Sequence, residues 1–295
     1  MDVYLVSQIA NGLIFGLLYA LIALGLSVIF SIMRVVNFAH GEFFMLGGYA
    51  LFALTVPLGL PAVAALPLAM IAVAVFGVLV ERLLLRPIYT ERIERTEEYA
   101  IILTFGLGLF LQNAALTGIG PFELTPESFF SGSANVIGDL WLSRDRLFAA
   151  FMAVVLILLT LFFFYRTWHG KALLATAQNR LGASVVGIDV IAMNRLAVAI
   201  ASLLAGGAGA LIAPIFLVYP DVGVAPVVKA FVIIVLGGLG SIPGAVVGAL
   251  LLGLTEALGS VYLSVAYRDV YAFLLLIVVL LFRPHGLFGQ KERRA

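Results

Sequence analysis

Six long stretches of this 295-residue chain contain no Asp, Glu, Lys or Arg: 3–33, 43–80, 99–122, 147–165, 196–220 and 230–255. A bilayer core about 30 Å thick is crossed by about 20 apolar residues in a helix. A charged side chain at its centre costs about 2.5–3.5 kcal/mol. The pattern therefore predicts an all-α integral membrane protein that crosses the bilayer several times.

Clusters of proline and glycine divide these stretches further. Pro-Leu-Gly-Leu-Pro at 57–61 splits 43–80 into a helical hairpin, and Gly-Gly-Leu-Gly-Ser-Ile-Pro-Gly at 237–244 marks a second turn. The segment 225–239 is short and carries Lys229, so it is either a crossing or a re-entrant segment surrounded by protein or by a cavity. We expect a single transmembrane domain, 1–295, with eight or nine crossings, near 8–31, 43–57, 62–80, 99–118, 147–165, 196–218, 225–239, 242–258 and 262–282.

Composition supports a membrane protein and excludes several other classes. Apolar residues make up 63% of the chain and charged residues 11%, against about 25% charged in soluble domains. A net charge of +1 argues against binding to nucleic acid, and the absence of cysteine excludes disulfides and thiolate metal sites. The first apolar stretch has no preceding basic residue and is too long for a cleaved signal peptide, so we expect it to stay as a membrane helix.

The basic residues predict the orientation. Segments 81–98, 166–195 and 283–295 hold four basic residues each, and Arg34 lies on the same side if nine segments cross. The opposite side then holds only Arg144, Arg146, Lys229 and Arg268. Cytoplasmic loops carry the excess of Lys and Arg. We therefore expect a multi-pass protein of the inner membrane with its N-terminus outside and its C-terminus in the cytoplasm.

Thirty glycines are spread through the chain, many at spacings that suit close helix packing. Lipid provides no hydrophobic drive between helices, so small residues on one face favour association by close backbone approach. We expect packing within the subunit, with a contact between subunits as the alternative. The expected packing residues are Gly12, Gly16, Gly206, Gly207, Gly209, Gly237, Gly238, Gly240, Gly244 and Gly248.

Catalytic and nucleotide-binding motifs are missing from the sequence. It has no P-loop, no His-Glu-x-x-His and no Gly-x-Ser-x-Gly, and His40, His169 and His285 lie far apart. The expected crossings hold almost no ionisable residues, which mark function inside a membrane; Glu256 comes closest, and we expect it to have a structural role near the outer end of its helix. The chain is thus predicted to be no enzyme and to bind no metal or cofactor. These absences favour a channel, or a transporter subunit that is powered by another polypeptide.

The polar segment 166–195 is predicted to be cytoplasmic. Residues 171–186 favour a helix that ends at Gly187, where glycine tolerates a left-handed C-cap. Such a helix on the membrane surface, with Gln178, Asn179 and Arg180 outward and small residues inward, fits a groove on a partner protein. The alternative is a surface helix that packs only on its own bundle.

Three stretches resemble one known family, the permease subunits of ATP-binding-cassette importers for branched-chain amino acids. They are 11–49, with Asn-Phe-Ala-His-Gly-Glu at 37–42; 175–188; and 229–245, with Gly-Gly-Leu-Gly-Ser-Ile-Pro-Gly. The resemblance covers essentially the whole chain. It implies three kinds of partner: a second, related permease, cytoplasmic ATP-binding subunits that use the ATP, and an extracytoplasmic solute-binding protein.

The resemblance also implies roles for particular residues. Ala183 and Gly187 match an Ala-x-x-x-Gly pattern that docks onto the ATPase subunit, although Leu181-Gly182 stands where the broader signature has Glu-Ala. The implied coupling residues are Ala177, Gln178, Asn179, Arg180, Ala183, Gly187 and Ile188. The family-motif residues Asn37, His40, Gly41 and Glu42 have no role assigned by the resemblance. Capping of the next helix by Asn37, with Glu42 nearby, is one interpretation, and a gate or subunit contact is the other.

The function expected from these observations is import of leucine, isoleucine and valine through a path formed with the second permease. An apolar, nearly uncharged lining would leave specificity mainly to the binding protein. Transport of urea or short-chain amides is the alternative within the family. A stand-alone channel or secondary carrier, or an intramembrane enzyme, are the alternatives outside it.

Overall fold

The computed structural model describes residues 3–89, 95–137 and 140–289. Arg92, Lys291, Arg293 and Arg294, on which the orientation argument partly depends, lie outside the described residues. In the described part, nine helices correspond to the nine expected crossings. They are α1 (Val3–Met33), α2 (His40–Thr55), α3 (Ala62–Val80), α5 (Thr96–Gly118), α6 (Arg144–Arg166), α9 (Val190–Ile212), α10 (Val224–Gly237), α11 (Ile242–Tyr262) and α12 (Arg268–Phe282).

Short elements connect these helices. A π-helical turn, η1 (Glu81–Leu85), and α4 (Arg86–Tyr89) continue α3, and the 3-10 turn η2 (Val265–Tyr267) precedes α12. The polar segment forms α7 (Trp168–Gln178) and α8 (Arg180–Val185). Strands β1 (Ser133–Ile137) and β2 (Leu140–Ser143) pair antiparallel before α6. Among the described helices, seven are long and apolar enough to span a membrane and α10 is a shorter apolar helix, which confirms the predicted polytopic helical fold.

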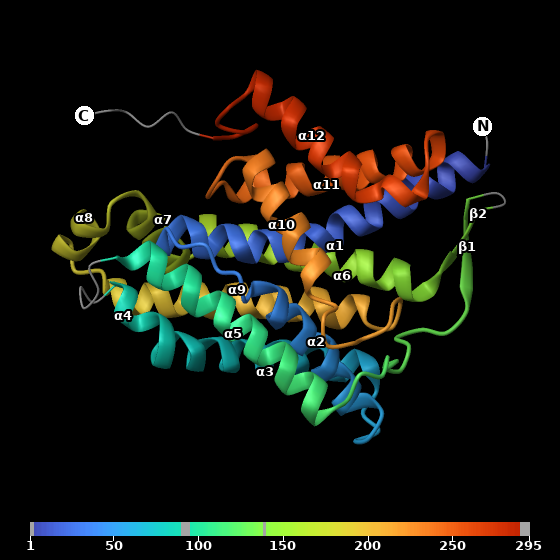
Figure 1. The fold of residues 1–295 in the computed structure, drawn as a ribbon, viewed down its shortest axis with the longest axis horizontal. Helices are drawn as coiled ribbons and strands as arrows, with labels where there is room; N and C mark the ends of the chain where they lie inside the picture. Colours follow the sequence, from blue (N-terminus) through green and yellow to red (C-terminus); the bar gives the residue numbers. More distant parts are fainter. Residues whose placement is uncertain (1–2, 90–94, 138–139, 290–295) are drawn as a thin grey trace.

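Helix α1 lies at the centre of the bundle, between α9, α10, α11 and α6 (Figure 1). Leu18, Leu21, Ile22 and Leu24 on this helix are fully buried. A helix that is apolar all round is suited to such a position, because every face meets another apolar surface. Gly12 and Gly16 let the backbone of α11 approach closely, since a side chain at either position would meet its backbone.

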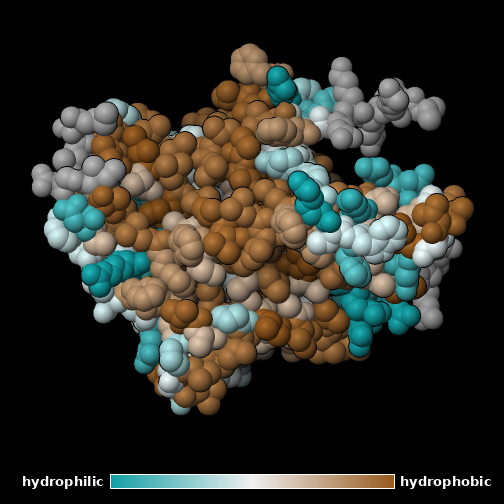
Figure 2. Space-filling model, turned by 180° about the vertical axis from the view of Figure 1, so that it is seen from behind, coloured by the Kyte–Doolittle hydropathy of each residue, from teal (hydrophilic) through white to brown (hydrophobic). Residues whose placement is uncertain are grey.

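The bundle has two ends, which Figure 1 shows at opposite sides of the view. The start of α1 and the β1–β2 hairpin lie at one, here named the hairpin end. The segment α7–α8, the end of α1 and the end of α12 lie at the other, the α8 end. Between them the surface seen in Figure 2 is a broad apolar band, with hydrophilic residues gathered toward both ends. This distribution matches a protein whose middle lies in hydrocarbon.

Two helices begin in the middle of the bundle instead of at an end. The His40 side chain, at the start of α2, hydrogen-bonds through Nε2 to the Ile22 carbonyl at 3.0 Å. Ile22 lies eleven residues before the end of α1, about 16 Å along the helix axis at 1.5 Å per residue. Gly223, directly before α10, packs against the backbone of Gly41. Helices α2 and α10 therefore start side by side at mid-depth.

From this common point the two helices run to opposite ends. Thr55 at the end of α2 accepts a hydrogen bond from the amide of Glu127 in the segment that leads to the hairpin. The end of α10 receives backbone hydrogen bonds from Leu287 and Phe288, past the end of α12. Irregular backbone at 34–39 and 213–223 leads into the two helices. The helix of segment 225–239 thus runs only from mid-depth to the α8 end, which explains why it has only 14 residues.

Candidate functional site

Helix α8 is a short, well-defined element at the α8 end. Asn179 caps its start, because its Oδ1 accepts a hydrogen bond from the Gly182 amide at 2.8 Å. Gly187 ends it with a φ of 87°. The Ile188 amide donates to the Ala183 carbonyl and the Gly187 amide to the Ser184 carbonyl, both at 3.0 Å, which is the Schellman pattern. Six helical residues are thus held by a cap at each end.

The outer surface of α8 is apolar. Leu181, Val185 and Val186 are 76%, 79% and 75% exposed. Ala183, between them in sequence, is only 4% exposed and faces α7 and α9, on which α8 rests. Leu181 and Val185 are four residues apart and so lie on one helix face. Three large apolar side chains on a polar segment form a surface suited to a protein partner.

The prediction of a single helix over 171–186 is wrong. The structure has two helices, α7 and α8, separated at Asn179, whose backbone is extended (φ −152°, ψ 102°). Asparagine bonds readily to the backbone two or three residues on, so here it starts a new helix instead of continuing the old one. The C-terminus expected at Gly187 is where α8 ends.

The other residues implied in coupling lie around this break. Gln178 and Asn179 are exposed, Ala177 and Ile188 are half-buried, and partial burial lowers the pKa of the half-buried Arg180 guanidinium. From the sequence we expected polar residues outward and small ones inward, and the outward-facing Leu181, Val185 and Val186 were missed. The four-residue spacing of Leu181 and Val185 was visible in the sequence, but spacing alone does not tell which face of a helix is exposed.

The family-motif residues 37–42 lie at the mid-depth start of α2. Asn37 does not cap this helix, contrary to one interpretation of the sequence. Its Oδ1 accepts from the Ala39 amide at 3.0 Å, and the residue at the N-cap is Ala39, without a side-chain cap. The chain enters the bundle here as a tight turn, held by Asn37 on one side and by the His40 bond to α1 on the other.

Glu42 in the first turn of α2 is 4% exposed. Its Oε1 accepts a hydrogen bond from Gln112 of α5 at 2.8 Å. Gly108 of α5 faces the same turn, with Glu42 and Ala39 as its nearest neighbours. Gln112, which the sequence argument missed, therefore joins α5 to the 37–42 turn.

A cluster of four charged side chains joins α10, α11 and α12. Lys229 Nζ lies 2.6 Å from Glu256 Oε1 and 3.3 Å from Asp269 Oδ1. Arg268 Nε lies 3.3 Å from Glu256 Oε2. Lys229 also donates to the Tyr19 hydroxyl of α1 at 3.4 Å. Two positive and two negative groups balance, so the charges of Lys229 and Glu256 that are withdrawn from water are paired.

Glu256 has the structural role that we expected from the sequence, and it is buried inside the bundle. It is 1% exposed and holds Lys229 and Arg268 together. The pair was missed because 27 residues separate Lys229 from Glu256, and no periodicity brings the two together.

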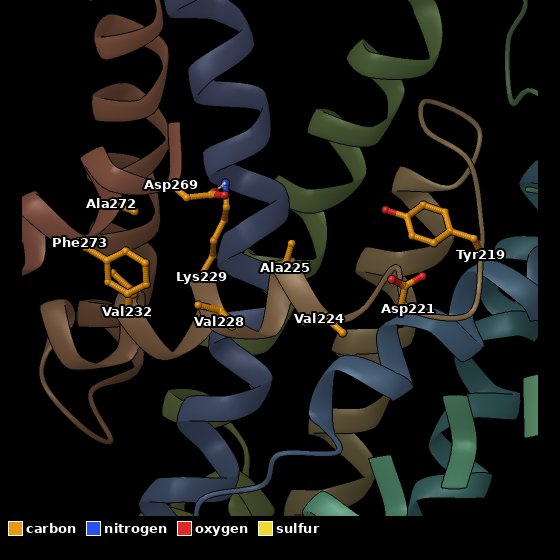
Figure 3. A pocket seen from close by; sticks show the side chains of 10 residues that line it. All are labelled: Tyr219, Asp221, Val224, Ala225, Val228, Lys229, Val232, Asp269, Ala272 and Phe273. Carbon is orange, nitrogen blue, oxygen red and sulfur yellow. Dashed lines mark ion pairs between the residues drawn. The ribbon is translucent and has the colours of Figure 1, made fainter. Parts of the chain in front are cut away.

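Lys229 and Asp269 line a cavity of about 360 Å³ between α10, α12 and the loop before α10. Figure 3 shows the two side chains pointing toward one another from α10 and α12. Tyr219 and Asp221 line the part of the cavity formed by the loop (Figure 3). The other lining residues are apolar: Val224, Ala225, Val228, Val232, Ala272 and Phe273.

The glycines singled out in the sequence lie at contacts between elements of this one chain. Gly12 and Gly16 face α11, and Gly237 faces Gly244, with Gly248 against Ile233. The remaining five have the following neighbours: Gly206 faces Val73, Gly207 faces Met70, Gly209 faces the backbone of Phe44, Gly238 faces Phe288 and Gly289, and Gly240 faces Ser31.

The geometry defines a polytopic helical membrane protein with two helices that start at mid-depth, a charged cavity beside one of them, and a short helix with exposed apolar side chains at one end. Comparison with known proteins gives the family. The family model described as the branched-chain amino acid transport system permease component matches residues 8–280. The chain belongs to this family.

Curated relatives match along nearly their whole length. The Escherichia coli (strain K12) high-affinity branched-chain amino acid transport system permease protein LivH is 34% identical, over 98% of this chain and 97% of its own. The Pseudomonas aeruginosa permease protein BraD is 35% identical, over 97% and 96%. The E. coli permease LivM is 27% identical over 92% of this chain and 68% of its own. Among solved structures, PsaBC from Streptococcus pneumoniae in complex with Fab aligns with 94% of this chain at 15% identity and a TM-score of 0.48, too low to support a conclusion.

Proposed function

We propose that this chain is a permease subunit of an ATP-driven importer and moves branched-chain amino acids (leucine, isoleucine and valine) across the inner membrane. The observation that carries the proposal is the match over nearly the full length to permeases named for this transport, LivH and BraD.

We further propose that separate cytoplasmic ATPase subunits bind and hydrolyse the ATP and dock on α8, and that this chain contributes no catalytic residue or cofactor. In support, α8 presents Leu181, Val185 and Val186 to the outside. The caps at Asn179 and Gly187 hold it as a rigid unit. Movement of a docked partner would pass through α7 to α6 and through α9 to the centre of the bundle, since α8 rests on α7 and α9. Ala177, Gln178, Arg180 and Ile188 flank this surface.

A second, related permease is proposed to cover the face formed by α10 and α12. The cavity on this face holds Lys229 and the 76% exposed side chain of Asp269, and irregular backbone lies beside it at 213–223. Exposed charges and irregular backbone at membrane depth are tolerated only against protein or a water-filled cavity. Lipid cannot cover such a face, whereas a partner permease can cover it and enclose a path. The similarity to LivM, a second permease by name, supports a related partner.

The α8 end is proposed to be cytoplasmic, which places the N-terminus outside and the C-terminus inside. The support is the distribution of described basic residues. Far more basic residues flank the helix ends on the α8 side than on the hairpin side. On the α8 side they are Arg34, Arg82, Arg86, Arg95, Arg166, Lys171, Arg180, Arg195 and Arg283, and on the hairpin side they are Arg144, Arg146 and Arg268. An extracytoplasmic solute-binding protein would then deliver the amino acid at the hairpin end.

The test is uptake by the importer complex that contains this chain, reconstituted in proteoliposomes. With ATP on the α8 side and leucine plus the binding protein on the hairpin side, we expect leucine to accumulate only while ATP is hydrolysed. Isoleucine and valine should compete, and urea and acetamide should not. Uptake of urea in place of leucine would overturn the assignment of substrate, and no ATP-dependent uptake of either would overturn the function.

A further inference from the structure

The cavity between α10 and α12 combines features that suit one chemical class of ligand. Its volume of about 360 Å³ lies at the small end of the range of about 300–1,000 Å³ for small-molecule sites. One wall carries a positive and a negative group, Lys229 and Asp269, with 3.3 Å between Nζ and Oδ1. The rest of the lining near them is branched or aromatic, with Val228, Val232 and Phe273 (Figure 3).

The two charged groups are held differently. Lys229 is 8% exposed and bonds at 2.6 Å to Glu256, which lies behind it and is fully buried. This short bond holds the lysine in place. Its contacts with Asp269 and with Tyr19 are longer, at 3.3 Å and 3.4 Å, and the Asp269 side chain is 76% exposed. Lys229 is therefore fixed, whereas its pairing with Asp269 is exchangeable.

We propose that this cavity is a transit site for the amino-acid zwitterion. The substrate carboxylate takes the place of Asp269 beside Lys229 Nζ, and Asp269 accepts hydrogen bonds from the substrate ammonium group. An α-amino acid carries both groups on one carbon, so it requires an acid and a base as close together as these two. One ion pair is exchanged for two, and neither Lys229 nor Asp269 is left unpaired, which matters because an unpaired charge away from water is costly.

A ligand with only one of the two charges does not satisfy this arrangement. A carboxylate alone would leave Asp269 without a partner, and an amine alone would bring a second positive group beside Lys229. The apolar lining then receives the branched side chain, with Val228, Val232 and Phe273 around it. The site selects by charge pattern first and by side chain second, and it complements a binding protein that delivers the substrate.

This inference rests on the proposed function, and labelling of single cysteines tests it directly, because the chain has no cysteine of its own. In the reconstituted complex, Val228→Cys places a thiol in the cavity. Leu263→Cys is the matched control, since Leu263 is 76% exposed in the turn after α11, away from the cavity lining. The probe is a water-soluble maleimide, and the complex with the unsubstituted chain gives the background.

Leucine should slow labelling at Val228→Cys, by about tenfold at ten times its dissociation constant, and leave labelling at Leu263→Cys unchanged. 4-Methylpentanoate and isopentylamine, which have the same side chain and only one charge each, should give no protection. In Asp269→Asn, which keeps the shape and removes the negative charge, leucine should lose its protective effect. Substitution of Lys229 is avoided, since it would leave the buried Glu256 without its closest partner.

Equal protection by leucine and 4-methylpentanoate, or protection that survives Asp269→Asn, would overturn the zwitterion assignment. If the wild-type complex takes up leucine and labelling at Val228→Cys is insensitive to it, the charged cluster only holds α10 to α12, and the transit site is wrong while the proposed function stands. If the wild-type complex takes up no leucine, the proposed function itself fails.

Discussion

The apolar face of α8 provides the sharpest prediction about coupling. We consider the double substitution Leu181→Ser with Val185→Ser, which removes the two large side chains that share one face of the helix. Both are about three-quarters exposed, at 76% and 79%. The subunit itself should therefore lose little, within about 0.5 kcal/mol, as for other surface positions.

The loss on docking is larger and follows from the same exposures. Full burial of a leucine or valine side chain contributes about 1.5–3 kcal/mol. Because three-quarters of each side chain is still exposed in the free subunit, a partner that covers the helix gains about three-quarters of this burial free energy, or about 1–2 kcal/mol for each residue. The double variant should then bind the ATPase subunits more weakly by about 2–4 kcal/mol, which is about a 30-fold to 1,000-fold rise in the dissociation constant.

The assay is titration of fluorescently labelled ATPase subunits onto the permeases in nanodiscs, with leucine-stimulated ATP hydrolysis measured on the same samples. Leu263→Ser is the matched control, because Leu263 is equally exposed but follows α11 at the hairpin end. We expect its affinity for the ATPase to equal that of the wild type. A wild-type dissociation constant for the double variant, at normal expression and thermal stability, would refute docking through this face.

Three further substitutions test the supporting structure. Gly187→Ala forces a side chain into φ 87°, at a cost of about 1–2 kcal/mol, and the Ile188 amide should exchange with solvent about 5 to 30 times faster. Glu256→Gln removes the buried charge that pairs with Lys229 and should lower the free energy of unfolding by about 3–5 kcal/mol; Lys229→Met in the same chain should restore much of it. Gly209→Val would drive a side chain into the backbone of α2, and we expect it to abolish a cooperative thermal transition. Gly106→Ala is the glycine control, since nothing lies within 4 Å of its position.

Each of these predictions has an outcome that contradicts its reasoning. Unchanged exchange at Ile188 would show that the C-cap does not hold α8. A Glu256→Gln variant as stable as the wild type would show that the charged cluster is well solvated. A folded Gly209→Val protein would show that α2 and α9 can separate without cost.

The positions of the helices followed from the sequence because a missing charge is a strong signal in a membrane. Several helix starts fell a few residues late, at 43, 99 and 147 instead of 40, 96 and 144. In each case the sequence argument stopped at a charged residue, whereas the structure places Glu42 inside the bundle with Gln112 as its partner. A buried charge with a distant partner cannot be distinguished from a solvated one by local pattern.

The features that depend on long-range pairing were not predicted. The common starting point of α2 and α10 depends on the contact of Gly41 with Gly223. The charged cluster depends on Lys229, Glu256 and Asp269, which come from three helices. The break at Asn179 was within reach, since asparagine is a strong N-cap residue. A helix-favouring run on both sides of it outweighed that signal.

In the proposed mechanism, ATP hydrolysis by a partner at the α8 end drives amino-acid movement through this chain. The most direct measurement compares leucine flux in proteoliposomes that contain this chain alone with flux in those that contain the assembled importer and its binding protein. We expect no flux from the chain alone, and flux from the importer that stops when ATP is withheld from the α8 side. Leucine movement by the chain alone without ATP, at the rate of the full importer, would contradict this mechanism.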